Sequence, residues 1–83
     1  MPRSADNQTL LHTFGRRVRA RRLELGLSQM ALAEAAGMSR NHIGCVERAE
    51  LAIGLETLVR LADGLQIDVG ALVAGLEVPR RRP

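Results

Sequence analysis

The segment from Leu27 to Arg48 constrains the fold more than any other part of this sequence. Its pattern predicts two short helices: Ser28 is a natural N-cap for the first, and Ser39 caps the second. Gly37 supplies the left-handed residue that ends the first helix. Apolar residues at helical spacing give each helix one buried face, formed by Leu32, Ala33 and Ala36 in the first and by Ile43 and Val46 in the second. Because few residues connect them and the alanines are small, the two helices must cross steeply and approach closely.

Two helices that cross in this way form a helix-turn-helix, whose second helix is offered to the major groove of DNA. Around this pair, further residues keep a recurrent order and spacing: Phe14-Gly15, Val18-Arg19, Arg22, Gly26-Leu27-Ser28-Gln29, Leu32-Ala33, Ala36-Gly37-Met38-Ser39, Ile43, Val46-Glu47-Arg48 and Leu55-Glu56-Thr57-Leu58. In these residues the chain resembles the phage-repressor (Cro/CI, XRE-type) helix-turn-helix proteins, from about Phe14 to Val73. Among these proteins, restriction–modification controller proteins and phage-type repressors both fit. The resemblance implies an all-α, five-helix, lambda-repressor-like fold with the helix-turn-helix at helices 2 and 3.

Composition agrees with a small helical domain that has one basic half. The chain has 83 residues and one aromatic side chain, Phe14, so its core must be built from aliphatic residues. Alanine and leucine predominate among them, which favours helices. Residues 1–48 hold eight arginines against four acids, residues 49–78 hold one arginine against five acids, and residues 79–83 add three arginines. A basic half that carries the helix-turn-helix suits a protein that presents one face to phosphate.

Several classes of protein are not favoured by the sequence. There is no apolar run of 18 residues and no signal peptide, so we expect a cytoplasmic protein without a membrane partner. The single cysteine, Cys45, excludes an internal disulfide. His42 and Cys45 share one helix face, but a structural zinc site needs about four ligands. We therefore expect no enzyme, no cofactor, no metal and no small-molecule substrate. Two roles for Cys45 stay open: a redox-sensitive thiol, or a small residue that lies against the base edges of DNA.

The organisation along the chain follows from caps and apolar stripes. We expect a flexible arm at residues 1–9, the helix-turn-helix domain at 10–76 and a basic, disordered tail at 77–83. Thr9 is expected to cap the first helix, which stops at Gly26. The fourth helix is expected to bury Leu55, Leu58, Leu61, Ala62 and Leu65, and the fifth, capped by Asp68, has the apolar stripe Val69, Leu72, Val73 and Leu76.

Arg22 is the anomaly of the first helix, because it stands on the apolar stripe formed by Leu11, Phe14, Val18 and Leu25. A buried arginine needs a partner, since an unpaired buried charge is expensive. Glu47, near the end of the second motif helix, is the acid best placed to meet it, and the family resemblance implies the same pair. We predict a structural ion pair, Arg22–Glu47, that ties the first helix to the recognition helix.

The resemblance also implies which residues meet DNA. Its base-reading positions fall on Arg40, Asn41, Gly44 and Cys45. Arg40 suits the O6 and N7 acceptors of guanine and Asn41 suits adenine, whereas Gly44 can only permit close approach. Contacts to phosphate are expected from the backbone amides at Ser28 and Gln29, from the Gln29 side chain, and from Arg48 and Arg19.

The chain departs from the family between residues 49 and 54. The family usually has glycine at 49, proline at 53 and basic or polar residues between them. Here Glu50 would repel phosphate, and Leu51 and Ile53 offer no donors. These two aliphatic residues either mark a contact surface or pack back onto the fourth helix.

A single module of this size has only a small contact area with DNA, so we expect a homodimer that reads paired half-sites. The predicted dimer interface is Val69, Leu72, Val73 and Leu76. The partners are then double-stranded DNA and a second copy of the chain, with a toxin or RNA polymerase as further candidates, because the DNA-binding half of an antitoxin also fits the sequence. The alternative from another class is a helical protein-interaction module with weak or no DNA binding.

Overall fold

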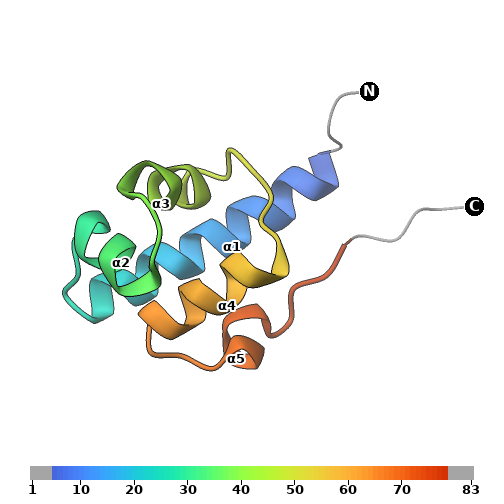
Figure 1. Cartoon of the computed structure of the whole chain (residues 1–83). Helices are drawn as coiled ribbons and strands as arrows, with labels where there is room; N and C mark the ends of the chain where they lie inside the picture. The colour runs from blue at the N-terminus through green and yellow to red at the C-terminus, as the bar shows by residue number, and fades with distance from the viewer. Residues whose placement is uncertain (1–4, 79–83) are drawn as a thin grey trace, which may run out of the picture.

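The computed structural model describes residues 5–78, with side chains from residue 8 onward. This part of the chain forms five helices and no strand, as predicted: α1 (Ala5–Glu24), α2 (Gln29–Ala36), α3 (Arg40–Glu47), α4 (Leu55–Gly64) and α5 (Val69–Val73) (Figure 1). α1 begins at Ala5, so Thr9 lies inside the helix and is not its cap. Residues 5–9 of the predicted arm are therefore helical. Residues 1–4 of that arm and residues 79–83 of the basic tail lie outside the described part.

Three of the predicted caps are present. The Ser28 hydroxyl accepts a hydrogen bond from the Ala31 amide at 3.0 Å, and the Ser39 hydroxyl accepts one from the His42 amide at 3.0 Å. The Asp68 carboxylate accepts from the Gly70 amide at 2.9 Å. These bonds satisfy amides that have no partner inside their own helix, and so they fix where α2, α3 and α5 begin.

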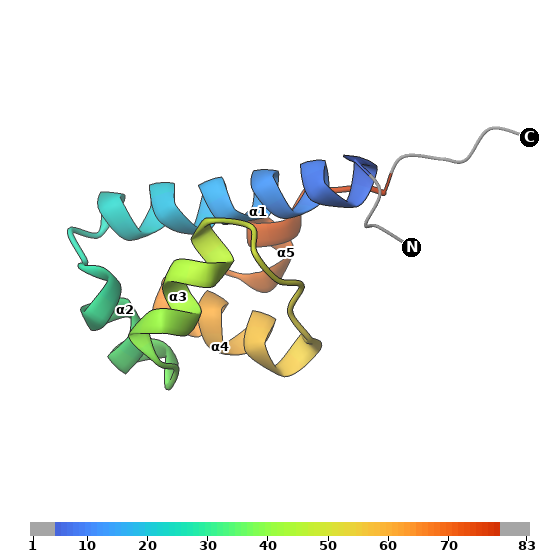
Figure 2. The same ribbon diagram turned by 90° about the horizontal axis from the view of Figure 1, so that it is seen from above.

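α1 runs along the length of the molecule, α2, α3 and α4 lie along one side of it, and α5 sits between α1 and α4 (Figures 1 and 2). Side chains from all five helices meet in one aliphatic core: Phe14, Val18, Leu32, Ala33, Ala36, Ile43, Val46, Leu61, Ala62, Leu65 and Leu72. Leu55 was expected in this core but is 76% exposed, because it occupies the first, outward-facing turn of α4.

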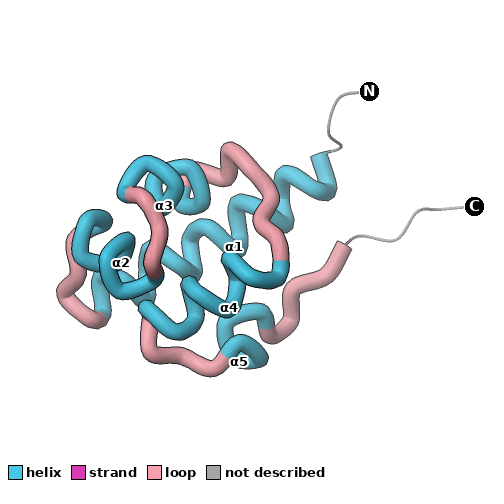
Figure 3. Tube along the Cα trace, viewed as in Figure 1, coloured by secondary structure: helices cyan, strands magenta, loops and turns pink. Residues whose placement is uncertain are grey.

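Four helices end in the same backbone motif, in which a left-handed residue is followed by two backbone bonds to the last turn. Glycine provides that residue after α1 and α2, at Gly26 and Gly37, but Ala49 (φ 60°) and Gln66 (φ 54°) provide it after α3 and α4. The left-handed conformation costs a residue with a Cβ roughly 1–2 kcal/mol. Ala49 thus adopts the left-handed conformation without being glycine, and the loop from α3 to α4 follows it (Figure 3).

Two arginines of α1 hold the ends of the later helices. The Arg17 guanidinium donates to the carbonyl of Leu72 at 3.1 Å, and Arg21 donates to the carbonyls of Leu65 at 2.9 Å and Gln66 at 3.0 Å. The Leu72 carbonyl lies in the last turn of α5, and Leu65 and Gln66 directly follow α4, where carbonyls lack a partner within the helix. This role was not predicted, because both arginines lie beside the apolar stripe of the first helix and not on it.

Candidate nucleic-acid interface

α3 is seated on α1 through Gly15. A Cβ at this position would lie 2.6 Å from the Val46 carbonyl oxygen and 2.8 Å from that of Glu47, which real Cβ atoms essentially never do. A residue without a side chain is therefore required where the end of α3 crosses α1. This contact fixes the height of α3 above the rest of the domain.

The predicted ion pair joins the same two helices. Arg22 Nε is 2.7 Å from Glu47 Oε2, and Arg22 Nη2 donates to Glu47 Oε1 at 3.0 Å. The two side chains are 9% and 4% exposed. Arg22 Nη1 also donates to the Leu27 carbonyl at 2.8 Å, and Gln29 Nε2 donates to Glu47 Oε1 at 3.1 Å. The hydrogen bond to Glu47 raises the pKa of Arg22 above its ordinary value. One buried network therefore links α1, the start of α2 and the end of α3.

The outward face of the helix pair carries the residues predicted to meet DNA. Arg40 and Asn41 are exposed on the first turn of α3, and Cys45 is half-buried one turn later. Ser28 is exposed at the start of α2, and Arg19 is exposed on α1. The Gln29 side chain donates one of its two N–H groups to Glu47, a contact that the sequence analysis did not predict. The second N–H, the side-chain oxygen and the backbone amide stay available to a ligand.

Gly44 and Arg48 make contacts that the sequence analysis did not predict. Gly44 is buried, and a Cβ there would lie 2.8 Å from Arg48 Nη1, so the Arg48 guanidinium covers it. Arg48 was predicted to bind phosphate, yet its Nε donates to Glu50 Oε2 at 2.9 Å and its Nη2 to Glu50 Oε1 at 3.2 Å. Hydrogen bonds from Arg48 hold the pKa of Glu50 below its usual range, and the same bonds raise the pKa of Arg48. The surface at this point is an arginine–glutamate pair and not a bare glycine.

The loop after α3 turns its aliphatic residues inward. Leu51 and Ile53 are half-buried and pack against the core, and Ile53 also lines an apolar groove on the surface. Among residues 8–78, no group of three His, Cys, Asp or Glu side chains lies close enough to hold a metal ion. In the described part of the chain, no helix is both long and apolar enough to cross a membrane.

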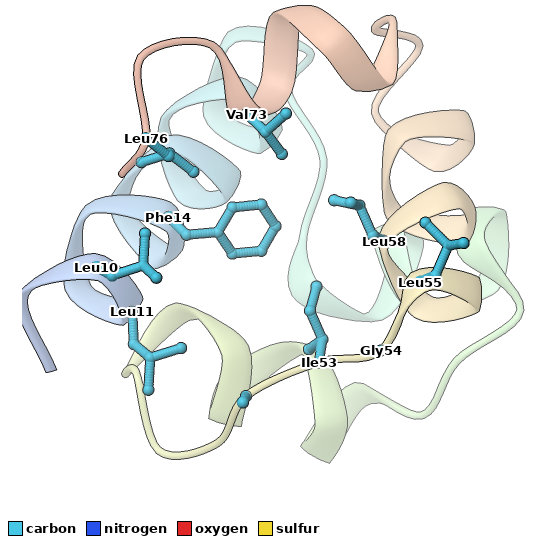
Figure 4. Close-up of a pocket in the computed structure, with 10 residues that line it drawn as sticks. Leu10, Leu11, Phe14, Ile53, Gly54, Leu55, Leu58, Val73 and Leu76 are labelled. Carbon is cyan, nitrogen blue, oxygen red and sulfur yellow. The ribbon is translucent and has the colours of Figure 1, made fainter. Parts of the chain in front are cut away.

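An apolar groove of about 400 Å³ opens on another side of the molecule, between α1, the start of α4 and the end of α5 (Figure 4). Its walls include Leu10, Leu11, Phe14, Ile53, Leu55, Leu58, Val73 and Leu76. Two members of the predicted dimer interface, Val73 and Leu76, line it. Leu72 does not belong to any free surface: it is 2% exposed, because it faces the core of its own chain.

Two capped helices that cross closely, with exposed hydrogen-bonding side chains on the second, define a helix-turn-helix. Residues 13–76 match the helix-turn-helix domain family, and the protein belongs to this family. This confirms both the resemblance and the predicted fold.

Individual relatives point the same way. The chain is 41% identical over 61 residues to the immunity repressor protein of Bacillus phage phi105, a match that covers 74% of this chain and 42% of the repressor. It is 45% identical over 56 residues to the control protein C.SmaI of Serratia marcescens, covering 68% of this chain and 67% of that protein. It also superimposes on the crystal structure of the restriction-modification controller protein C.AhdI from Aeromonas hydrophila. That comparison gives a TM-score of 0.73 and 39% identity, and it covers 75% of this chain and 94% of the other.

Proposed function

We propose that the chain binds double-stranded DNA sequence-specifically, as a homodimer on paired half-sites, and thereby controls transcription. The observation that carries this proposal is the exposure of Arg40 and Asn41 on the first turn of α3, the end of a recognition helix that enters the groove. A role like that of the controller proteins is supported by the 45% identity to C.SmaI and the TM-score of 0.73 with C.AhdI, and a role like that of the phage repressor by the 41% identity to the immunity repressor protein. Such a regulator acts in the cytoplasm, by covering a promoter or by contacting RNA polymerase.

The proposed contacts fall into two groups. Arg40 presents a planar fork that matches the two acceptors of guanine, and the Asn41 amide matches adenine. Cys45 borders the same contact. The amides at the start of α2 and the Arg19 side chain hold phosphates, which positions the helix without carrying sequence information.

Selection of bound sites from random DNA, followed by affinity measurements, tests the proposal. Arg40→Ala should cost about 1–3 kcal/mol on the selected site and relax preference at one base position per half-site. Arg60→Ala is a matched control, because it removes an exposed arginine paired with Glu56 on α4 and leaves α3 intact. If Arg40→Ala binds more weakly but keeps its sequence preference, Arg40 holds the backbone. An absence of binding even at low salt would instead support a protein-interaction module.

We propose that a second copy of the chain covers the apolar groove. A half-site module gains affinity from a twofold partner, and recognition helices about 34 Å apart would match one turn of DNA. Leu55, at 76% exposure, stands at the rim of the groove, where a partner would remove it from water. Val73 and Leu76 belong to this proposed interface as predicted, while Val69 and Leu72 do not line the groove and are replaced by residues of α1 and α4.

Sedimentation of two matched variants tests the interface. Leu55→Glu should produce a monomer that binds a single half-site normally and a paired site poorly. Leu23→Glu is the control, because Leu23 is 52% exposed on α1 and does not line the groove. A Leu55→Glu protein that stays dimeric would place the interface elsewhere.

A further inference from the structure

The arginine that follows α3 occupies the middle of its outward face. The Arg48 guanidinium folds back over the preceding turn, so that Nη1 is 2.8 Å and Cζ 3.5 Å from the point where a Cβ on Gly44 would stand. Position 44 lies on the same helix face as positions 40, 41 and 45. The guanidinium therefore fills the place that a side chain at the centre of the recognition surface would take.

Glu50 holds the guanidinium in that place. The carboxylate accepts from Nε at 2.9 Å and from Nη2 at 3.2 Å, which are the two donors of one edge of the group. Glu50 is itself positioned by the turn at Ala49, because its amide donates to the Cys45 carbonyl at 2.9 Å. The Cys45 sulfur lies 3.9 Å from Nη2. Backbone and side-chain contacts thus agree on one orientation of Arg48.

A guanidinium has a second forked edge, formed by Nη1 and Nη2. Nη1 has no hydrogen-bond acceptor among residues 8–78, and beyond its bond to Glu50 Nη2 donates only to the Cys45 sulfur, a weak acceptor 3.9 Å away. Guanine presents O6 and N7 in the major groove as a pair of acceptors that such a fork matches. An arginine already paired with a carboxylate adds little net charge for phosphate, but its remaining fork is fixed in direction. Fixed direction is what discrimination between bases requires.

We infer that Arg48 is a second base-reading residue, seated on Gly44 and oriented by Glu50, with guanine as its acceptor. The inference rests on the proposed function. It replaces the prediction from sequence that Arg48 holds a phosphate, since reaching outward to the DNA backbone would break the contacts with both Gly44 and Glu50.

Three variants test it by site selection and by the ratio of specific to nonspecific affinity. Arg48→Ala removes the reading group. Glu50→Gln removes the orienting charge and keeps the shape. Gly44→Ala puts a methyl group 2.8 Å from Nη1 and displaces the guanidinium. All three should relax preference at one shared base position per half-site, distinct from that of Arg40, and lower the ratio by about fivefold or more.

Two further measurements, of nonspecific binding and of thermal stability, distinguish a lost base contact from other effects of these substitutions. Glu50→Gln should strengthen nonspecific binding, because a negative charge near phosphate is lost. Gly44→Ala should raise the thermal midpoint, because alanine favours the helix, so that its loss of preference is not a loss of fold.

Other outcomes overturn the inference. If Glu50→Gln strengthens binding to all sequences equally and leaves the preference unchanged, Glu50 only masks Arg48. If Arg48→Ala weakens binding to all sequences equally and lowers the salt slope by about one unit, Arg48 holds a phosphate. A parent protein that selects a site while all three variants keep its preference refutes this inference alone. A parent protein that selects no sequence refutes the proposed function as well.

Discussion

Two arginine–glutamate pairs flank the end of the recognition helix, and they differ in burial. In the Arg22–Glu47 pair the side chains are 9% and 4% exposed, whereas in the Arg48–Glu50 pair they are 55% and 52% exposed. Both pairs use two hydrogen bonds of similar length. The same pair of side-chain types therefore occurs once in a buried and once in an exposed environment, and two of its members, Glu47 and Arg48, are neighbours in the sequence.

The difference in burial assigns the two pairs different roles. Breaking a buried pair strands a charge away from water, so Arg22 and Glu47 hold the architecture. An exposed pair is screened by solvent and contributes little to stability, so Arg48 and Glu50 are free to be used for recognition. A glycine lies near each pair: Gly15 meets the backbone carbonyls at the end of α3, and Gly44 lies beneath the Arg48 guanidinium. The comparison can therefore be tested at the acids and at the glycines.

The largest expected effect is at the acids. Glu47→Gln should lower the free energy of unfolding by about 3 kcal/mol or more, because Arg22 would keep its charge without a partner. Glu50→Gln, the matched change in the exposed pair, should leave the unfolding midpoint nearly unchanged. Urea unfolding of both variants measures the difference. If the two substitutions lowered the free energy of unfolding equally, the two pairs would not differ in their contribution to stability.

A double substitution sharpens the first result. Arg22→Met combined with Glu47→Leu should recover part of the loss, because no buried charge remains. Recovery should be incomplete, since the Leu27 carbonyl and the Gln29 amide lose the partners that the pair supplied. Full loss in the double variant would mean that these hydrogen bonds, and not the stranded charge, carry the effect.

The glycines should respond in opposite directions. Gly15→Ala should destabilise the fold by about 1–3 kcal/mol, because its methyl group would meet the backbone carbonyls of α3, which cannot move without shifting the helix. Gly44→Ala should stabilise the fold by up to about 1 kcal/mol, because its methyl group meets only the end of the flexible Arg48 side chain. Thermal unfolding of the two variants gives the signs, and a stabilising Gly15→Ala would show that α3 does not rest on α1 as described.

The smallest expected effect is a shift in titration. Hydrogen bonds from Arg48 lower the pKa of Glu50, so the contribution of the pair is present above the ordinary pKa of a glutamate and is lost as the pH falls through the lowered one. Carboxyl NMR of Glu50 should therefore show a pKa below the usual range. Arg48→Ala should raise that pKa toward the usual range. An unchanged pKa in the variant would indicate that the exposed pair does not persist in solution.

The buried pair was predictable from the sequence and the exposed pair was not. Arg22 interrupts an apolar stripe of fixed period, and that interruption demands a partner at a position which the helix pattern defines. The Arg48–Glu50 contact depends on the left-handed turn at Ala49, a residue whose type does not indicate such a turn.

The other differences between the predictions and the structure also have local causes. Leu55 and Leu72 both lie on apolar stripes, and only the packing of α4 and α5 decides that one faces solvent and the other the core. The start of α1 was misplaced because Thr9, a good cap by type, lies within a sequence that continues as helix.

The two arginines of α1 that grip the later helices also bear on how the protein becomes folded during synthesis. Arg17 and Arg21 are made early, but their acceptors lie 55 and 44 residues further along the chain, in α5 and at the end of α4. Contacts over such distances in sequence close slowly, because a long loop must be ordered before they form. The hydrogen bonds from α1 to Leu65 and Leu72 therefore form only after nearly all of the described chain has been made, whereas α3 rests on α1 and α2, which precede it in the chain.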